Sequence, residues 1–176
     1  MKYVILTAVV ILCGFIGYLF SRKYKQRSNF FSALILLCQK FDVEINYSRE
    51  RLKNIFLSLD EKIKKNLCGI DKNYLLYLDK EIELEKSELF KNIGFLKESE
   101  KDVIFPFFRT LGRSDVDSQS KEIKNYLTRF ESLFSSADAE NKKYGTLSIK
   151  LGVILGLFLV VIFVWGCIWM LRLFLR

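Results

Sequence analysis

Histidine is absent from all 176 residues of the chain, which removes the commonest general base and a frequent metal ligand. The four cysteines form no C-x-x-C pair, so the pattern supports neither a zinc site nor a thioredoxin-like motif. No glycine-rich phosphate loop, G-x-S-x-G or H-E-x-x-H motif occurs. A calcium loop starting at Asp115 would need glycine where Ser120 stands and glutamate where Tyr126 stands. We therefore expect a protein that is not an enzyme and that holds no metal, cofactor or small-molecule substrate.

Charge is missing from two long stretches, Tyr3 to Phe20 and Leu151 to Leu171. Helices of this length reach roughly 27 Å or more, close to the hydrocarbon thickness of about 30 Å. The alternatives are a buried core helix and, for the first stretch, a signal peptide. Basic residues follow Phe20 in place of an A-x-A-like cleavage site, which favours a retained anchor. The sequence thus predicts transmembrane helices over residues 1–20 and 148–172, the second followed by a short tail over 173–176.

Basic residues gather at the inner ends of both stretches. They are Arg22, Lys23, Lys25 and Arg27 after the first, and Lys142, Lys143 and Lys150 before the second. Cytoplasmic flanks of membrane helices collect Lys and Arg, and anionic lipid attracts each by about 1 kcal/mol. We expect a two-pass protein of the cell membrane with these side chains at the membrane surface, a basic collar over 21–27 and a cytoplasmic domain over 28–147. The collars account for the net charge of +8, so we expect no nucleic-acid partner.

The domain has apolar residues at helical spacing and few strand signals. Two stripes stand out: Phe30, Leu34, Leu37, Phe41 and Ile45, and then Ile123, Tyr126, Leu127, Phe130, Leu133, Phe134 and Ala137. Shorter helices are predicted near 50–59, 62–78, 87–96 and 98–111, with breaks at Ser48, Gly69, Gly94 and Gly112, and with Pro106 kinking the last helix or marking its first turn. The predicted fold class is all-α, a compact antiparallel bundle of about six helices between two transmembrane helices.

Three groups of residues carry a family resemblance. They are Thr110-Leu111-Gly112-Arg113-Ser114-Asp115 with Gln119; Glu44-Ile45 with Tyr47 and Leu52; and Glu140, Lys143, Gly145, Lys150-Leu151-Gly152 and Gly156-Leu157. With them the whole chain resembles the stage III sporulation protein AB family. The stretch from Cys68 to Glu85 and Pro106 depart from the pattern, which puts the packing of the middle helices in doubt.

The resemblance implies a fold similar to the cytoplasmic domains of type II secretion inner-membrane platform proteins. It also implies a mother-cell membrane protein that serves as a scaffold in the channel complex joining mother cell and forespore. The implied partners are the other proteins of that complex, including its cytoplasmic AA-type ATPase. A two-span signalling subunit or a channel-forming subunit of another system stays open as the alternative.

The turn after Thr110 has two interpretations. Gly112 suits a helix end at positive φ, and Ser114 or Asp115 suits the cap of the next helix. We expect this turn to be primarily structural. The sharper alternative is partner binding by Arg113, Ser114, Asp115 and Gln119.

Overall fold

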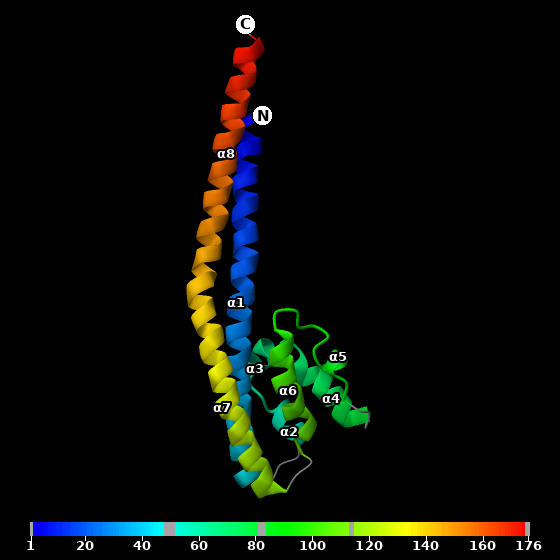
Figure 1. Cartoon of the computed structure of the whole chain (residues 1–176). Helices are drawn as coiled ribbons and strands as arrows, with labels where there is room; N and C mark the ends of the chain where they lie inside the picture. The colour runs from blue at the N-terminus through cyan, green and yellow to red at the C-terminus, as the bar shows by residue number, and fades with distance from the viewer. Residues whose placement is uncertain (1, 48–51, 81–83, 113–114, 175–176) are drawn as a thin grey trace. The chain divides into compact units, whose positions relative to one another are not determined.

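The computed structural model describes residues 2–47, 52–80, 84–112 and 115–174, and these fold into helices without a strand among them (Figure 1). The elements are α1 (Lys2–Tyr47), α2 (Leu52–Leu57), α3 (Glu61–Asn66), α4 (Ile70–Lys80), α5 (Lys86–Leu89), α6 (Glu98–Thr110), α7 (Val116–Glu140), the π-helix η1 (Asn141–Gly145) and α8 (Thr146–Phe174). They form two compact units, Met1–Lys25 with Ala139–Arg176, and Gln26–Asp138. We call these the hairpin unit and the helical domain. The all-α prediction is confirmed.

The hairpin unit pairs the first part of α1 with α8. The two helices run side by side in opposite directions, so that the N and C termini lie at the same end of this unit (Figure 1). Glycines allow their backbones to touch. A Cβ atom at Gly17 would lie 2.6 Å from the carbonyl oxygen of Ser148, and one at Gly152 would lie 2.7 Å from that of Cys13. Only residues without a side chain permit so close an approach.

Within the described residues, one helical run is long and apolar enough to cross a membrane, judged by length and composition. It is Val116–Ile162, which contains a window of mean hydropathy 2.3 with 17% of its residues buried. The apolar part of that run belongs to α8. The predicted span over 1–20 is not established by this criterion, and several of its first side chains lie outside the described part of the chain.

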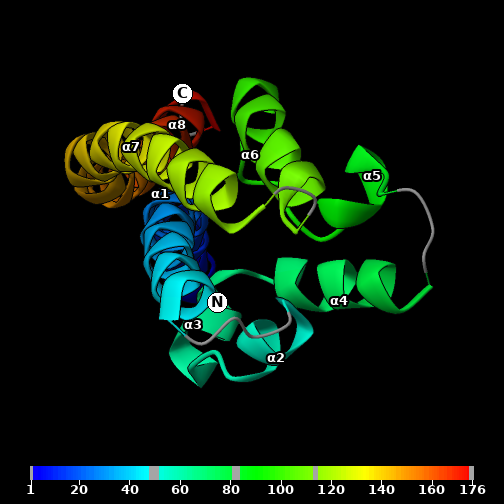
Figure 2. The same cartoon turned by 90° about the horizontal axis from the view of Figure 1, so that it is seen from below.

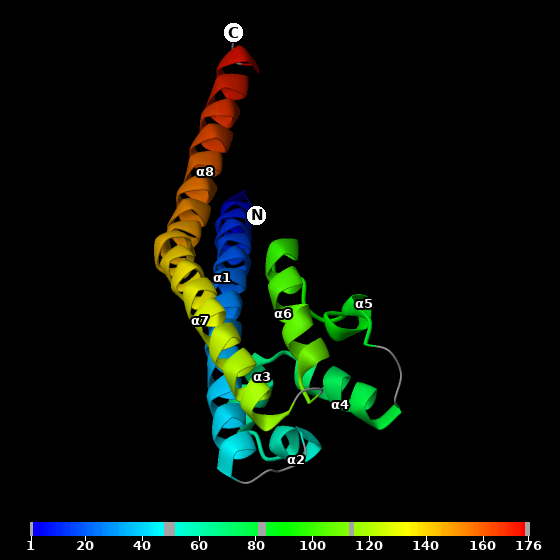
Figure 3. The same cartoon turned by 60° about the horizontal axis from the view of Figure 1, so that its bottom comes forward.

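The helical domain is held together by aromatic contacts that link its helices in sequence. Rings of α1 and α2 meet, then α2 and α4, then α4 and α6, then α6 and α7, with centroids 5.1–5.3 Å apart. The rings concerned are Phe41, Phe56, Tyr74, Phe108, Phe107 and Phe130. This order leaves α6 between α4 and α7, as seen from below and obliquely (Figures 2 and 3). Two of these pairs are edge-to-face and two are tilted, and aromatic pairs at such spacing contribute about 0.5–1.5 kcal/mol each beyond burial.

Both predicted apolar stripes are confirmed as core. The first is buried along its length, from Phe30 to Ile45. In the second, Ile123, Phe130 and Ala137 are buried and the other members pack against the core while half-buried. The periodicity of 3.6 residues therefore located the two longest helices of the domain correctly.

The structure differs from the sequence prediction mainly in where helices begin and end. The expected first span, collar and first domain helix are one helix, α1, because nothing between Ser21 and Ser28 breaks a helix. The segment near 62–78 divides into α3 and α4 at the predicted break, where Cys68 and Gly69 have φ of 54° and 93°. The helix predicted over 87–96 is the single turn α5, followed by a loop that contains Gly94. The break predicted at Ser48 lies outside the described residues.

The other two predicted interruptions have clear outcomes. Gly112 follows the end of α6 with φ of 80°, as predicted for a helix-ending glycine. Pro106 lies inside α6, so it does not mark the first turn. Its side chain is exposed, and the Thr110 hydroxyl donates to the Pro106 carbonyl over 3.1 Å in the last turn.

Candidate functional site

Large apolar side chains cover the outside of the hairpin unit. Those with more than half of their surface exposed include Ile11, Leu12, Phe15, Ile154, Leu155, Phe158, Val161 and Trp165. They come from both α1 and α8. Soluble proteins rarely expose a contiguous apolar patch of more than a few hundred Å². Exposed apolar side chains of this kind are typical of a surface that contacts lipid or another protein.

The predicted basic residues lie at one end of that surface. The Tyr24 and Tyr144 rings meet with centroids 5.8 Å apart, which brings the collar after the first apolar stretch level with the one before the second. The Lys23 ammonium lies 5.8 Å from the Phe20 ring centroid, and that of Lys143 lies 5.2 Å from the Tyr144 ring centroid. The remaining exposed members are Arg22, Lys25, Lys142 and Lys150. Tyrosine beside lysine is typical of the boundary between a membrane and water.

Arg27 requires a correction. Its guanidinium is buried in the helical domain, where Nε and Nη2 donate to Glu100 Oε1 over 2.8 and 2.6 Å. The two side chains are 6% and 3% exposed. The second carboxylate oxygen of Glu100 accepts the Lys97 backbone N–H at the start of α6, over 2.8 Å. An arginine held in this way faces the domain core, so it does not serve at the membrane surface as the sequence analysis expected.

The turn between α6 and α7 has the expected structural elements. A Cβ atom at Gly112 would meet Leu52 Cδ1, the end of a side chain that can shift, so the positive φ is the main reason for glycine here. Asp115 Oδ2 accepts the Ser118 backbone N–H over 3.2 Å, so Asp115 caps α7. Hydrogen bonds from the Ser118 hydroxyl and backbone lower the pKa of Asp115. Arg113 and Ser114 lie outside the described residues.

The polar side chains that follow this turn face inward. Gln119 and Ser120 are both buried, and the Ser120 hydroxyl donates to Asp42 Oδ1 on α1 over 2.6 Å. Lys124 Nζ lies 3.9 Å from the other oxygen of Asp42. The sequence suggested Gln119 as a partner-binding residue, yet its side chain offers little surface to a partner. The partner-binding role of this turn stays a prediction.

Sequence reasoning missed two polar features of the domain. One is the Arg27–Glu100 ion pair, whose members are 73 positions apart. The other is the buried carboxylate of Asp71 beside a lysine-lined pocket. Neither has a local spacing signal, since both depend on how distant helices pack.

Comparison with known proteins gives a consistent result. The chain matches the family described as stage III sporulation protein AB over residues 2–164. It is similar to the stage III sporulation protein AB of Bacillus subtilis (strain 168), with 24% identity over 160 residues that cover 88% of this chain and 94% of that protein. No solved structure matches the chain. Because the match covers nearly the whole chain, including the paired helices and the domain between them, this protein belongs to the stage III sporulation protein AB family and has a role in sporulation.

Proposed function

We propose that this chain is a two-pass membrane protein in which both helices of the hairpin unit cross the bilayer. The observation that carries the proposal is the exposed apolar surface shared by α1 and α8. Placing such side chains in lipid removes about 25 cal/mol per Å² of unfavourable hydration. The glycine contact between the helices fits this setting, because helices in lipid associate through small residues and close packing.

The basic residues give the proposed orientation. Since Lys23 and Lys143 lie at the same end of the hairpin unit, both helices have their basic flank on one side. The excess of Lys and Arg on cytoplasmic flanks supports a cytoplasmic position for residues 28–147. The mother cell as the compartment is what the family resemblance implies. Both chain ends would lie on the opposite side of the membrane.

Within this topology, the protein acts as a scaffold of the channel complex between mother cell and forespore. It works by protein contacts rather than catalysis, and the cytoplasmic AA-type ATPase of the same system is the proposed soluble partner. Support comes from the family membership and from the lack of histidine and of catalytic motifs in the sequence.

Labelling of cysteines in intact cells tests the topology. A thiol reagent that does not cross membranes should label a cysteine appended at the N-terminus and leave Ser132→Cys, at an exposed position of α7, at the level of the parent chain. Opening the cells should then expose Ser132→Cys to the reagent, which controls for its accessibility. The reverse pattern in intact cells would overturn the orientation and the ATPase contact together.

A further inference from the structure

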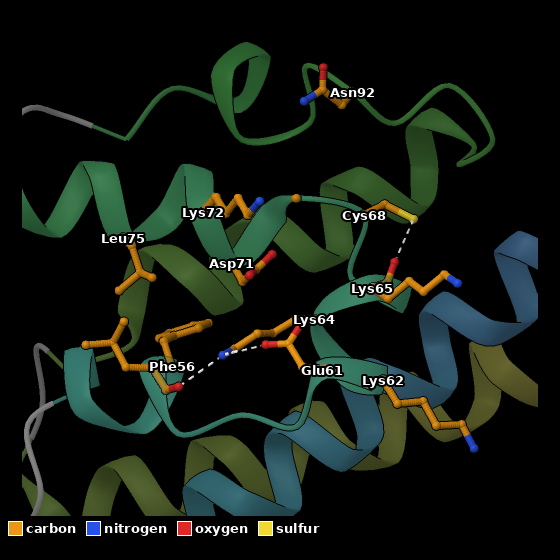
Figure 4. A pocket seen from close by; sticks show the side chains of 12 residues that line it. Phe56, Glu61, Lys62, Lys64, Lys65, Cys68, Asp71, Lys72, Leu75 and Asn92 are labelled. Atoms are coloured by element: carbon orange, nitrogen blue, oxygen red, sulfur yellow. Dashed lines mark hydrogen bonds and ion pairs between the residues drawn. The ribbon is translucent and has the colours of Figure 1, made fainter.

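The helical domain contains a pocket of about 1050 Å³ beside α2, α3 and the start of α4 (Figure 4). Its apolar part consists of Phe56, Leu57 and Leu75. Four lysines also line the pocket: Lys62, Lys64, Lys65 and Lys72. Leu57 is 56% exposed, although the ring beside it, Phe56, is fully buried. The pocket thus combines an apolar floor with a basic rim.

Asp71 is the unusual residue of this pocket. It lies in the first turn of α4 and is 3% exposed, and Figure 4 shows it between Lys72 and Lys64. Its Oδ1 atom is buried and has no hydrogen-bond partner among the described residues. A buried acceptor without a donor costs about 1–3 kcal/mol, and more when it is charged. Such a cost is tolerated where another molecule supplies the missing donor.

Most of the lysine ammonium groups in the pocket lining are free of ion pairs and hydrogen bonds within the described residues. Lys64 donates to the Leu57 carbonyl over 3.0 Å and lies 3.5 Å from a Glu61 carboxylate oxygen. Lys62, Lys65 and Lys72 are exposed, and their ammonium groups make no ion pair or hydrogen bond within the described parts of the chain. Three exposed lysines in the lining of one pocket create a local excess of positive charge, which attracts acidic groups.

We propose that this pocket binds an acidic, leucine-containing peptide segment of a protein partner. The apolar side chains of the segment fill the floor formed by Phe56, Leu57 and Leu75. Its carboxylates pair with Lys62, Lys65 and Lys72. One of its backbone N–H groups donates to Asp71 Oδ1. The inference rests on the proposed function only in that a cytoplasmic protein partner exists.

A peptide fits these groups better than a simple anion does. A phosphate group would meet the Asp71 carboxylate as a like charge, and it would leave the apolar floor uncovered. A peptide segment supplies a donor, acidic groups and apolar groups along one strand, as extended and helical recognition segments do. The pocket therefore matches a protein ligand in sign of charge, in polarity and in hydrogen-bonding capacity.

The test measures binding of a fluorescein-labelled peptide of leucine and glutamate to the full chain in detergent, by fluorescence polarisation. We expect saturable binding that weakens by about tenfold or more in Lys65→Glu/Lys72→Glu, because reversing two rim charges replaces attraction with repulsion. The matched control is Arg109→Glu/Lys121→Glu, which changes the net charge equally at exposed positions outside the pocket and should leave binding unchanged. Where the glutamate variant fails to melt cooperatively, Lys65→Gln/Lys72→Gln takes its place.

Asp71→Leu, which removes the acceptor, gives a second readout that a purely structural carboxylate would not show. Removing a buried oxygen that lacks a hydrogen-bond partner should hold or raise the melting temperature while peptide binding weakens several-fold. A lowered melting temperature with unchanged binding would overturn the role of Asp71.

Equal weakening in pocket and control variants, or competition by inorganic phosphate beyond that of chloride at the same ionic strength, would overturn the peptide proposal. Because the assay does not depend on orientation in the membrane, its failure is distinguishable from failure of the proposed topology.

Discussion

At the scale of single residues, the Arg27–Glu100 pair joins α1 to α6 inside the domain. Burying two charges costs several kcal/mol of hydration for each ion, which a close ion pair with further hydrogen bonds offsets. Both oxygens of Glu100 are used, one by Arg27 and the other by the Lys97 N–H. Loss of either partner leaves the other charged and buried.

We therefore expect Arg27→Met to lower the free energy of unfolding by about 3–5 kcal/mol. Thermal melting of the full chain in detergent, followed by helicity, measures the effect. Adding Glu100→Gln should restore most of the loss, because glutamine removes the charge yet keeps an oxygen for the Lys97 N–H. As a control, Lys25→Met, at an exposed position two residues away, should leave the melting temperature nearly unchanged. Equal losses at Lys25 and Arg27 would contradict this account.

The cap at Asp115 leads to a prediction with a pH dependence. Asp115→Ala should lower the melting temperature by a few degrees, whereas Asp115→Asn should keep most of the cap. The pKa of Asp115 is lower in the folded chain than in the unfolded chain. Its ionised form therefore stabilises the fold above the unfolded pKa of about 3.9, and that contribution is lost as pH falls through the lower folded pKa.

Melting temperatures of the parent and Asp115→Ala chains, compared at neutral pH and near pH 3, check this prediction. The difference between the two should shrink at acid pH. A difference that stays constant would mean that the carboxylate charge does not contribute to the cap. Separately, full stability of Asp115→Asn together with loss of sporulation would favour partner docking at this turn.

At the scale of helices, the contact between α1 and α8 depends on particular glycines. A Cβ atom at Gly152 would lie 2.7 Å from a backbone oxygen of α1, whereas one at Gly14 would have 4.0 Å to its nearest neighbour, Val153 Cγ2. Both are helical positions, so alanine gains the same propensity at each, about 1 kcal/mol. The difference between the two substitutions isolates the packing of the pair.

Gly152→Ala should therefore separate the helices and lower the melting temperature in detergent by several degrees, while Gly14→Ala should hold or raise it. On denaturing gels, the Gly152→Ala chain is expected to migrate as a less compact species than the parent chain. The Gly14→Ala chain should migrate like the parent. Identical behaviour of the two variants would show that the close approach does not contribute to stability.

Helix ends were harder to predict than helix faces. The stripes from Phe30 and from Ile123 follow a period that any buried helix face must follow, so their burial was predictable. The break at Gly69 was also predictable, because glycine suits its positive φ, whereas the positive φ of the neighbouring Cys68 was not, since a non-glycine residue in that region has no sequence signature. The short α5 likewise depends on tertiary contacts, such as the Asn73 side-chain amide donating to the carbonyls of Glu88 and Leu89.

At the scale of the whole molecule, the sequence predicted the all-helical class, the family, the polar domain between two apolar stretches and the cap at Asp115. It assigned Arg27 by its neighbours in the chain, since a basic residue beside Arg22, Lys23 and Lys25 resembles the rest of that group. The packing of α6 shows that Arg27 pairs with the buried carboxylate of Glu100. The pocket around Asp71 was unpredictable for the same reason, because α2, α3 and α4 contribute to it together.

The glycine contact within the hairpin unit has a consequence for transport. Where Gly17 and Gly152 bring two backbones together, no water column fits between α1 and α8. We therefore expect no conduction between these two helices within one chain. If the proposed channel role holds, its lumen would be enclosed by several chains, of which this protein would contribute one part of the wall. Conductance would then appear only on assembly, and a purified monomer in a planar bilayer should be electrically silent.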